Sequence, residues 1–451
     1  MSESIMKLLI SIIVVAAMFF ALPLYGDAVD LSTAYQRAKE YDSRLATAKA
    51  DNLMYREEIG KARSQLRPSV RVNASRGRNA TEYTSILTAR TSSSYYNSVN
   101  YGVSIRQPLF NLSSYAGYKQ AKAAAEKSDV DLQKEDIALI VRITEAYCNA
   151  LYADDNRDFS QALIKAAQEQ LQQAKRRFEK GFGTITEINE AQAGYDMALA
   201  DGLEIVNSVE FTRRELEHLT GQYPTDLCKI VPEKLVLAQP VPNSVQSWID
   251  LALANNYDVV GGHQEMQIAK REIEKQKYSR YPTIDLVGGK NYSESDNSYS
   301  IGSIYDTYSV SLQMSMPIYT GGYVSASVRQ AHAKWLKAQE QLTSQERGVQ
   351  SEVRKYYNGV VTSIAQIHAY EQALTSHEVA LTGTKKGFEA GLRSNIDVLD
   401  AQQKLFASRR NLAKSRYQYI LNRLMLKQAS GTLSVADIEE VNGWLVATKR
   451  L

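Results

Sequence analysis

The side chains of this 451-residue chain that are best placed for chemistry are two aspartates three positions apart. Asp397 and Asp400 share one face of a predicted helix, which follows a turn marked by Gly391. Carboxylates gathered in this way attract cations and repel anions. They also suit a structural role, because the helix dipole stabilises acidic side chains in the first turn of a helix. The spacing alone leaves an ion-selective site and a stabilised helix start as alternatives.

The rest of the sequence offers little for catalysis. No nucleophile elbow, P-loop or dinucleotide-binding fingerprint occurs. The histidines lack the spacing of metal ligands: His218, His263, His332, His368 and His377. Cys148 and Cys228 are too few for a disulfide framework, and we expect buried, unpaired thiols. We therefore predict that the chain is not an enzyme and holds no cofactor or metal.

Composition narrows the class of protein further. Lys and Arg number 53 and Asp and Glu 50, so the formal net charge is only +3. That balance excludes the broad basic surface of a nucleic-acid-binding protein. Glycine and proline are scarce, at 24 and 9 residues, which favours long uninterrupted elements.

The N-terminus resembles a secretory signal. Lys7 precedes an apolar run from Leu8 to Leu22, and the small residues Gly26 and Ala28 follow. We predict a signal peptide over residues 1–26, with cleavage after Gly26 or Ala28; a retained signal anchor is the alternative. The run is short for a membrane-spanning helix. No cysteine near the cleavage point could carry a lipid, and no later segment is apolar enough for a membrane helix. An exported chain that crosses a membrane would then have to use strands.

Two long tracts without proline predict very long helices. No proline lies between Pro108 and Pro224, and none follows Pro317. A continuous helix over residues 112–180 would be about 100 Å long at about 1.5 Å per residue. Apolar residues within it recur at spacings of three and four, as in a coiled-coil seam: Ile164, Ala167, Leu171, Ala174 and Phe178.

Alternating apolar and polar residues mark two hairpins, at residues 66–110 and 281–319. Strands of about ten residues with one apolar face are typical of membrane β-strands. A soluble antiparallel sheet with one buried face is the alternative. We expect residues 76–98 and 289–304, rich in Ser, Asn, Thr and Tyr, to form exposed loops. Tyrosines that suit a membrane interface cluster here: Tyr95, Tyr96, Tyr101, Tyr292, Tyr299, Tyr305, Tyr308 and Tyr319.

The chain repeats itself with an offset of about 210 residues. Phe178, Gly181 and Glu187 recur as Phe388, Gly391 and Asp397, and Pro108 recurs as Pro317. We predict a first repeat over residues 27–221, a linker over 222–243, a second repeat over 244–431 and a C-terminal segment over 432–451. Each repeat would contain a helix, a hairpin, a long helix, a turn (near 181–187 or 391–397) and a helix.

Four strands cannot close a barrel with an interior, and an open sheet edge cannot lie in lipid. The chain must therefore oligomerise. A dimer would supply eight strands, whose interior is filled by side chains. A trimer would supply twelve, enough for a water-filled lumen, and we favour it. The helices would extend the same tube on one side of the membrane.

Four strings carry a resemblance that covers essentially the whole mature chain. They are Met316–Gly322, Phe388-x-x-Gly391 before Asp397–Ala401, Phe178-x-x-Gly181 before Ile185–Ile188, and Gly431–Leu433. In this order and at these separations they resemble the TolC family of outer-membrane efflux and type I secretion channels. The resemblance implies a mixed α and membrane-β fold. A trimeric, twelve-stranded barrel would continue into a long periplasmic α-helical barrel.

The resemblance also implies function and partners. The chain would be a passive exit duct in the outer membrane of a Gram-negative bacterium, for type I protein secretion and/or multidrug efflux. A periplasmic adaptor and an inner-membrane ABC or proton-driven transporter would open its periplasmic tip, and outer-membrane lipid would surround the barrel. The missing N-terminal cysteine matches the unlipidated branch. A surface coiled-coil adhesin and a secreted hydrolase with a helical domain are the alternatives.

Finally, the resemblance assigns residues to the closed tip. Asp397 and Asp400 match the aspartates that line its narrowest point. Arg393 matches a position that links neighbouring helix pairs, with Thr186 and Glu187 as its partners. The family usually has Asp in place of Glu187, and its best-known members carry Tyr in place of Phe388. A solvated arginine in a polar turn is the alternative for Arg393. Gly181, Gly391, Pro108 and Pro317 are assigned structural roles in turns and at strand ends.

Overall fold

The computed structural model describes residues 28–296 and 302–446, and the predicted signal peptide lies outside this range. The described chain forms two compact units. The helical unit comprises residues 28–46, 135–256 and 349–446. The strand unit comprises residues 47–134, 257–296 and 302–348. Each unit draws on both halves of the chain, so the units do not coincide with the two sequence repeats.

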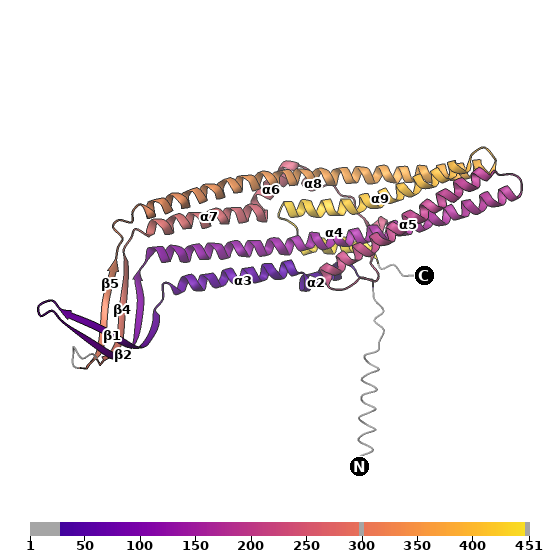
Figure 1. Cartoon of the computed structure of the whole chain (residues 1–451). Coiled ribbons are helices and arrows are strands. Elements are labelled where there is room, and N and C mark those ends of the chain that lie inside the picture. The colour runs from indigo at the N-terminus through magenta and orange to yellow at the C-terminus, as the bar shows by residue number, and fades with distance from the viewer. Residues whose placement is uncertain (1–27, 297–301, 447–451) are drawn as a thin grey trace, which may run out of the picture. The chain divides into compact units, whose positions relative to one another are not determined.

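The strand unit is built on a four-stranded antiparallel sheet in the order β1-β2-β4-β5 (Figure 1). Its strands are β1 (Ser69–Ser85), β2 (Arg90–Phe110), β4 (Thr283–Ser295) and β5 (Ser303–Ser315). The helices that enter this unit are α3 (Ser43–Ser64), α4 (Leu112–Glu179), α7 (Tyr257–Tyr278) and α8 (Tyr323–Glu389). The two hairpins meet at β2 and β4, so one sheet combines the two sequence repeats.

Cross-strand register gives this sheet two chemically different faces. Val70 pairs with Ile105 and Val72 with Val103, and these side chains share one face. Asn73 on the other face pairs with Gly102, which in turn pairs with Asn291. The apolar side chains remain exposed, with Val310 at 80% and Leu312 at 67% of full exposure. A face of this kind is suited to lipid rather than to a protein core.

Two glycines allow the hairpins to approach each other closely. A Cβ added at Gly102 would lie 2.9 Å from the carbonyl oxygen of Lys290, and one at Gly289 would lie 2.8 Å from that of Val103. These positions lie on β2 and β4, where the two repeats join. Side chains there would push the central strands apart.

The expected loop at residues 76–98 is wrong. β1 continues to Ser85 and β2 begins at Arg90, so only residues 86–89 form the turn. Unbroken pairing from Ser69↔Arg106 to Ser85↔Arg90 holds the segment extended, and Thr84 and Thr91 share a 3.0 Å hydrogen bond. The polar residues suggested a loop, but solvated strands also carry polar residues on both faces. In the second hairpin β4 and β5 likewise occupy most of 289–304, and residues 297–301 lie outside the described chain.

The helical unit contains residues 135–179 of α4 and 349–389 of α8, together with the shorter elements. These are α2 (Leu31–Tyr41), α5 (Ile185–Thr220), β3 (Lys229–Ile230), η1 (Pro232–Lys234), α6 (Val245–Asn255), α9 (Asn395–Ala429), α10 (Val435–Gly443) and β6 (Leu445–Val446). β3 pairs with β6, and Val29 forms a parallel bridge with Leu227, so both ends of the described chain attach to the segment between the repeats. Tyr35, Tyr147 and Tyr419 are its largest fully buried side chains.

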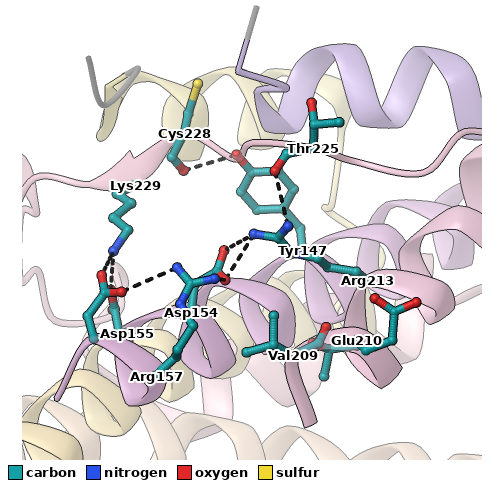
Figure 2. Close-up of polar contacts among 12 residues, drawn as sticks. Tyr147, Asp154, Asp155, Arg157, Val209, Glu210, Arg213, Thr225, Cys228 and Lys229 are labelled. Atoms are coloured by element: carbon teal, nitrogen blue, oxygen red, sulfur yellow. Dashed lines mark hydrogen bonds and ion pairs between the residues drawn. The ribbon is translucent and has the colours of Figure 1, made fainter. Parts of the chain in front are cut away.

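An ion-pair cluster ties α4 and α5 to that segment (Figure 2). Arg213 binds both carboxylate oxygens of Asp154, at 3.0 and 2.9 Å, and also donates to the carbonyl of Thr225 at 3.0 Å. Lys229 lies 3.3 Å from Asp155, to which Tyr417 of α9 donates a 2.7 Å hydrogen bond. Burial raises the pKa of Asp155, although the Tyr417 and Lys229 contacts oppose that shift.

None of the described helices is long and apolar enough to cross a membrane.

Candidate functional site at the paired turns

The two helix-connecting turns of the helical unit have the same backbone design. α4 ends at Glu179 and α8 at Glu389, and Gly181 (φ 78°) and Gly391 (φ 75°) follow in the left-handed conformation. Phe182 N–H donates to the carbonyl of Arg177 at 2.9 Å, as Leu392 N–H donates to that of Gly387 at 2.8 Å. These bonds close the last helical turn as in a Schellman cap, which favours glycine at the left-handed position.

Hydroxyl caps start the returning helices. The Thr184 hydroxyl accepts a 3.2 Å bond from Glu187 N–H, and Ser394 accepts the equivalent 3.2 Å bond from Asp397 N–H. Only the second turn completes a capping box, because Asp397 also accepts a 2.9 Å bond from Ser394 N–H. Glu187 does not reciprocate, and its Oε2 is buried without a hydrogen-bond partner among the described residues.

The duplicated turns exchange an arginine and a glycine. Arg177 in the first turn corresponds to Gly387 in the second, and Gly183 corresponds to Arg393. The Arg393 side chain lies over Gly387, where an added Cβ would be 2.9 Å from its Cγ. Gly183 is packed against the backbone at Phe178 and Arg177, with added-Cβ distances of 3.1 and 3.3 Å. At these exchanged positions each turn keeps one arginine, Arg177 before the first turn's glycine and Arg393 after the second turn's glycine.

Arg177 connects the first turn to the second. Its guanidinium carbon lies 4.6 Å from the ring centroid of Phe388, and its Nη1 donates to the Phe388 carbonyl at 3.3 Å. Phe388 is only 3% exposed, so this cation–π contact is largely shielded from water. Nη2 of Arg177 also donates to the carbonyl of Phe182 at 3.4 Å. One side chain thus bridges α4, its own turn and the end of α8.

Buried amides form a second bridge. Gln170 of α4 donates to the side-chain oxygen of Asn395, and Asn395 donates to the carbonyl of Glu187 at 3.3 Å. Asn395 is fully buried and Gln170 is 4% exposed. Satisfied polar groups in such a position are costly to separate, because each would otherwise remain buried without a partner. The bridge fixes the start of α9 against both α4 and α5.

The predicted site residues fall into two groups. Asp397 is a helix cap, and its hydrogen bonds with the backbone and hydroxyl of Ser394 lower the pKa of its carboxyl. Asp400 is exposed and stands three residues further along the same helix face. Arg393 and Thr186 are also exposed, and within the described part of one chain Arg393 forms no hydrogen bond or ion pair with Thr186 or Glu187. That contact stays a prediction about the assembled trimer.

Among the described residues, no group of His, Cys, Asp and Glu could hold a metal ion. Cys148 and Cys228 are both buried and free. Burial raises the pKa of Cys148 to about 12, so its thiol is protonated and unreactive at neutral pH.

Comparison with known proteins assigns the architecture. The family model for outer membrane efflux proteins matches residues 34–222 and 248–432. The chain belongs to this family. It is 32% identical over 430 residues to the outer membrane protein TolC of Vibrio cholerae, covering 94% of this chain and 95% of that protein. It is also 32% identical to the alkaline protease secretion protein AprF of Pseudomonas aeruginosa, covering 94% and 89%.

Solved structures agree on the fold. The outer membrane protein VceC of Vibrio cholerae superposes with a TM-score of 0.76 at 18% identity, covering 89% of this chain and 96% of that one. As a member of the family, the chain supplies four strands to a trimeric twelve-stranded outer-membrane barrel and its helices to a periplasmic tunnel. It is an outer-membrane exit duct of secretion and efflux systems, and works with a periplasmic adaptor and an inner-membrane transporter.

Sequence reasoning missed Arg177, Gln170 and Asn395. Aligning the repeats at an offset of 210 would have exposed the exchange of Arg177 with Gly387. Nothing in the sequence pairs Gln170 with Asn395, because 225 residues separate them and their contact depends on how the two helical hairpins pack.

Proposed function

We propose that the paired turns form the gate of this export duct, and that Asp397 and Asp400 make the gate selective for cations. The observation that carries the proposal is the pair of bridges between the turns, Arg177 to Phe388 and Gln170 to Asn395. A tip that widens by parting the two helical hairpins of a chain must break both bridges. The turns are therefore a point where a small number of contacts can hold the duct shut.

The charges support selectivity. Asp397 is an ordinary carboxylate at neutral pH, and its hydrogen bonds with Ser394 lower the pKa of its carboxyl further. Asp400 is exposed and makes no hydrogen bond or ion pair among the described residues. A trimer would gather six such carboxylates around one axis, and a narrow ring of like charge concentrates cations and repels anions. The cargo would pass through without chemical change, so no catalytic group is needed.

Arg393 is proposed to act between chains. It projects from the second turn, packs on Gly387 and leaves its guanidinium exposed. Thr186 and Glu187 of a neighbouring chain are its proposed partners, and an exposed ion pair of this kind contributes only about 0–1 kcal/mol. Threefold repetition would make such weak links a reversible latch.

The cargo is proposed to include polypeptides. AprF, a relative named for alkaline protease secretion, matches over 94% of this chain. The same duct could serve small molecules, since the partner at the inner membrane selects what enters it.

The test of the gate is the ion selectivity of single channels in a planar bilayer. Asp400→Asn removes one charge per chain without disturbing the cap of α9, since Asp397 remains. Glu389→Gln is the matched control, because Glu389 is an exposed acid at the end of α8. We expect Asp400→Asn to lower the cation-to-anion permeability ratio by at least about twofold and to weaken block by trivalent cations. Equal permeability ratios for Asp400→Asn and Glu389→Gln would refute the proposal.

A further inference from the structure

We propose that Arg76 and Arg78 of β1 form a binding site for the phosphate groups of an outer-leaflet glycolipid. Both side chains are exposed, and both stand on the apolar face of the sheet, in register with Val70, Val72 and Ala74. Two arginines on a lipid-facing strand are costly unless they lie beyond the hydrocarbon. Their position therefore points to the headgroup region.

The register places them just outside a band of tyrosines. Ala74 pairs with Tyr101, which pairs with Tyr292, and these two rings stack with centroids 4.6 Å apart. Tyrosines of this kind mark the edge of the hydrocarbon layer. Arg76 and Arg78 lie two and four residues further along β1, which is roughly 5 and 10 Å beyond the tyrosine row for a strand tilted by about 45°.

Their surroundings leave the positive charge uncompensated. Arg76 faces Val99 and Arg78 faces Asn97 across the hairpin, and neither arginine forms an ion pair within the described part of the chain. Glu294 of β4 is level with Arg76, since both pair with Val99 of β2. Because β2 lies between them, β1 and β4 are about 10 Å apart. Tyr292 donates a 2.9 Å hydrogen bond to Glu294, which further occupies that carboxylate.

Lys290, on the same face of the sheet, has a counter-ion that the two arginines lack among the described residues. Lys290 lies one row inside the tyrosines and is paired with Asp306 at 3.2 Å, and it also lies 4.8 Å above the ring of Tyr308. A cation at the membrane level thus has its own counter-ion, whereas the two arginines beyond it do not. Guanidinium groups bind phosphate oxygens through paired, charge-assisted hydrogen bonds.

The direction of the strands selects the leaflet. β1 and β2 are joined to the helices through their ends near Ser69 and Phe110, and the turn at residues 86–89 is at the opposite end. Because the helices of this family are periplasmic, that turn lies outside the cell. Arg76 and Arg78 are on the turn side of the tyrosine row. The occupant is therefore a phosphorylated glycolipid of the outer leaflet, with the diphosphorylated form of lipid A as the probe.

The experiment compares Arg76→Gln/Arg78→Gln with Arg71→Gln/Arg90→Gln. The control pair removes the same charge from the same hairpin, with Arg71 on β1 and Arg90 on β2, but both lie on the opposite, polar face. Purified trimers are titrated with lipid A, and bound lipid is counted by native mass spectrometry. We expect about tenfold weaker binding for the first variant, because hydrogen bonds to charged groups are lost, and unchanged binding for the control. Lipid A without its phosphates should bind both variants and the parent equally.

Three outcomes would overturn the proposal. One is equal lipid A binding by Arg76→Gln/Arg78→Gln and the control. Another is a loss of trimer stability in Arg76→Gln/Arg78→Gln without added lipid, together with the same loss in Asp306→Asn. That result would show that the arginines pair with Asp306 of a second copy where two chains meet in the barrel. The third is an equal loss of binding to lipid A and to phosphatidylglycerol vesicles in Arg76→Gln/Arg78→Gln, because such a site would not be specific for the glycolipid. Single-channel conductance of each variant checks that the barrel has assembled, and the count of bound lipid does not depend on the proposed gate.

Discussion

Replacing Arg177 should open the duct. The contact between its guanidinium and the Phe388 ring, at 4.6 Å with the ring 3% exposed, is worth about 1–2 kcal/mol because it is largely desolvated. Three copies in a trimer give about 3–6 kcal/mol if the chains open together. That amount changes the closed-to-open equilibrium constant by about 10²- to 10⁴-fold, since each 1.4 kcal/mol is about a factor of ten.

The assay is single-channel recording of Arg177→Gln, Phe388→Leu and the double variant. Arg177→Gln keeps a hydrogen-bond donor but removes the planar cation, whereas Phe388→Leu removes the ring and keeps its carbonyl. We expect both single variants to spend more time at high conductance, and the double variant to add little, because both changes remove one contact. Arg176→Gln is the control, since Arg176 is an exposed neighbour with the same charge. If Arg177→Gln conducted like Arg176→Gln, or if the effects of the two single variants were fully additive, the contact between Arg177 and Phe388 would not hold the gate shut.

Three further predictions concern the latch, the ion-pair cluster and the helix ends. Arg393→Ser should raise the closed-state conductance, and unchanged conductance would count against the latch between chains. Because burial raises the pKa of Asp155 above its usual value of 3.8, the folded chain holds that proton more readily, and the free energy of unfolding falls as pH rises from about 4 through the raised pKa. Asp155→Asn, which keeps an acceptor for Tyr417, should therefore gain thermal stability relative to the parent as the pH rises; a constant difference across that range would be a contradiction. Gly431→Ala should destabilise the helical unit by several kcal/mol, because the new Cβ would lie 2.3 Å from the backbone carbonyl oxygen of Asn255. Gly391→Ala has a similar φ but open space around the new Cβ, so it should cost only about 1–2 kcal/mol. Equal melting temperatures for the two variants would contradict this difference.

The spacing of prolines and the alternation of apolar and polar residues predicted most of the fold. The tract without proline predicted a helix over 112–180, and α4 covers Leu112–Glu179. Alternation of apolar and polar residues predicted four strands and which face each side chain takes, since the side-chain period of a strand is fixed at two. It also gave strands of about ten residues, whereas β1 has 17 and β2 has 21. The extra residues are polar on both faces, so only their pairing across the hairpin shows that they are extended.

The site was predicted less completely, for a physical reason. Gly181 and Gly391 could be placed from sequence because a left-handed helix end favours glycine. Asp397 drew two interpretations, and the structure shows the helix cap directly while the ion-selective role stays a prediction. The bridge from Arg177 to Phe388 depends on the rotation of one helical hairpin against the other. No local pattern specifies that rotation, because it is set by packing between segments about 210 residues apart.

A nearly closed, cation-selective duct is tested most directly by the conductance and reversal potential of the purified, detergent-solubilised protein in a planar bilayer under a salt gradient. We expect small steps with a cation-selective reversal potential, since the proposed duct is held nearly shut at an acidic tip. Large, unselective steps from the parent protein, or no steps from material shown to be a folded trimer, would contradict this expectation.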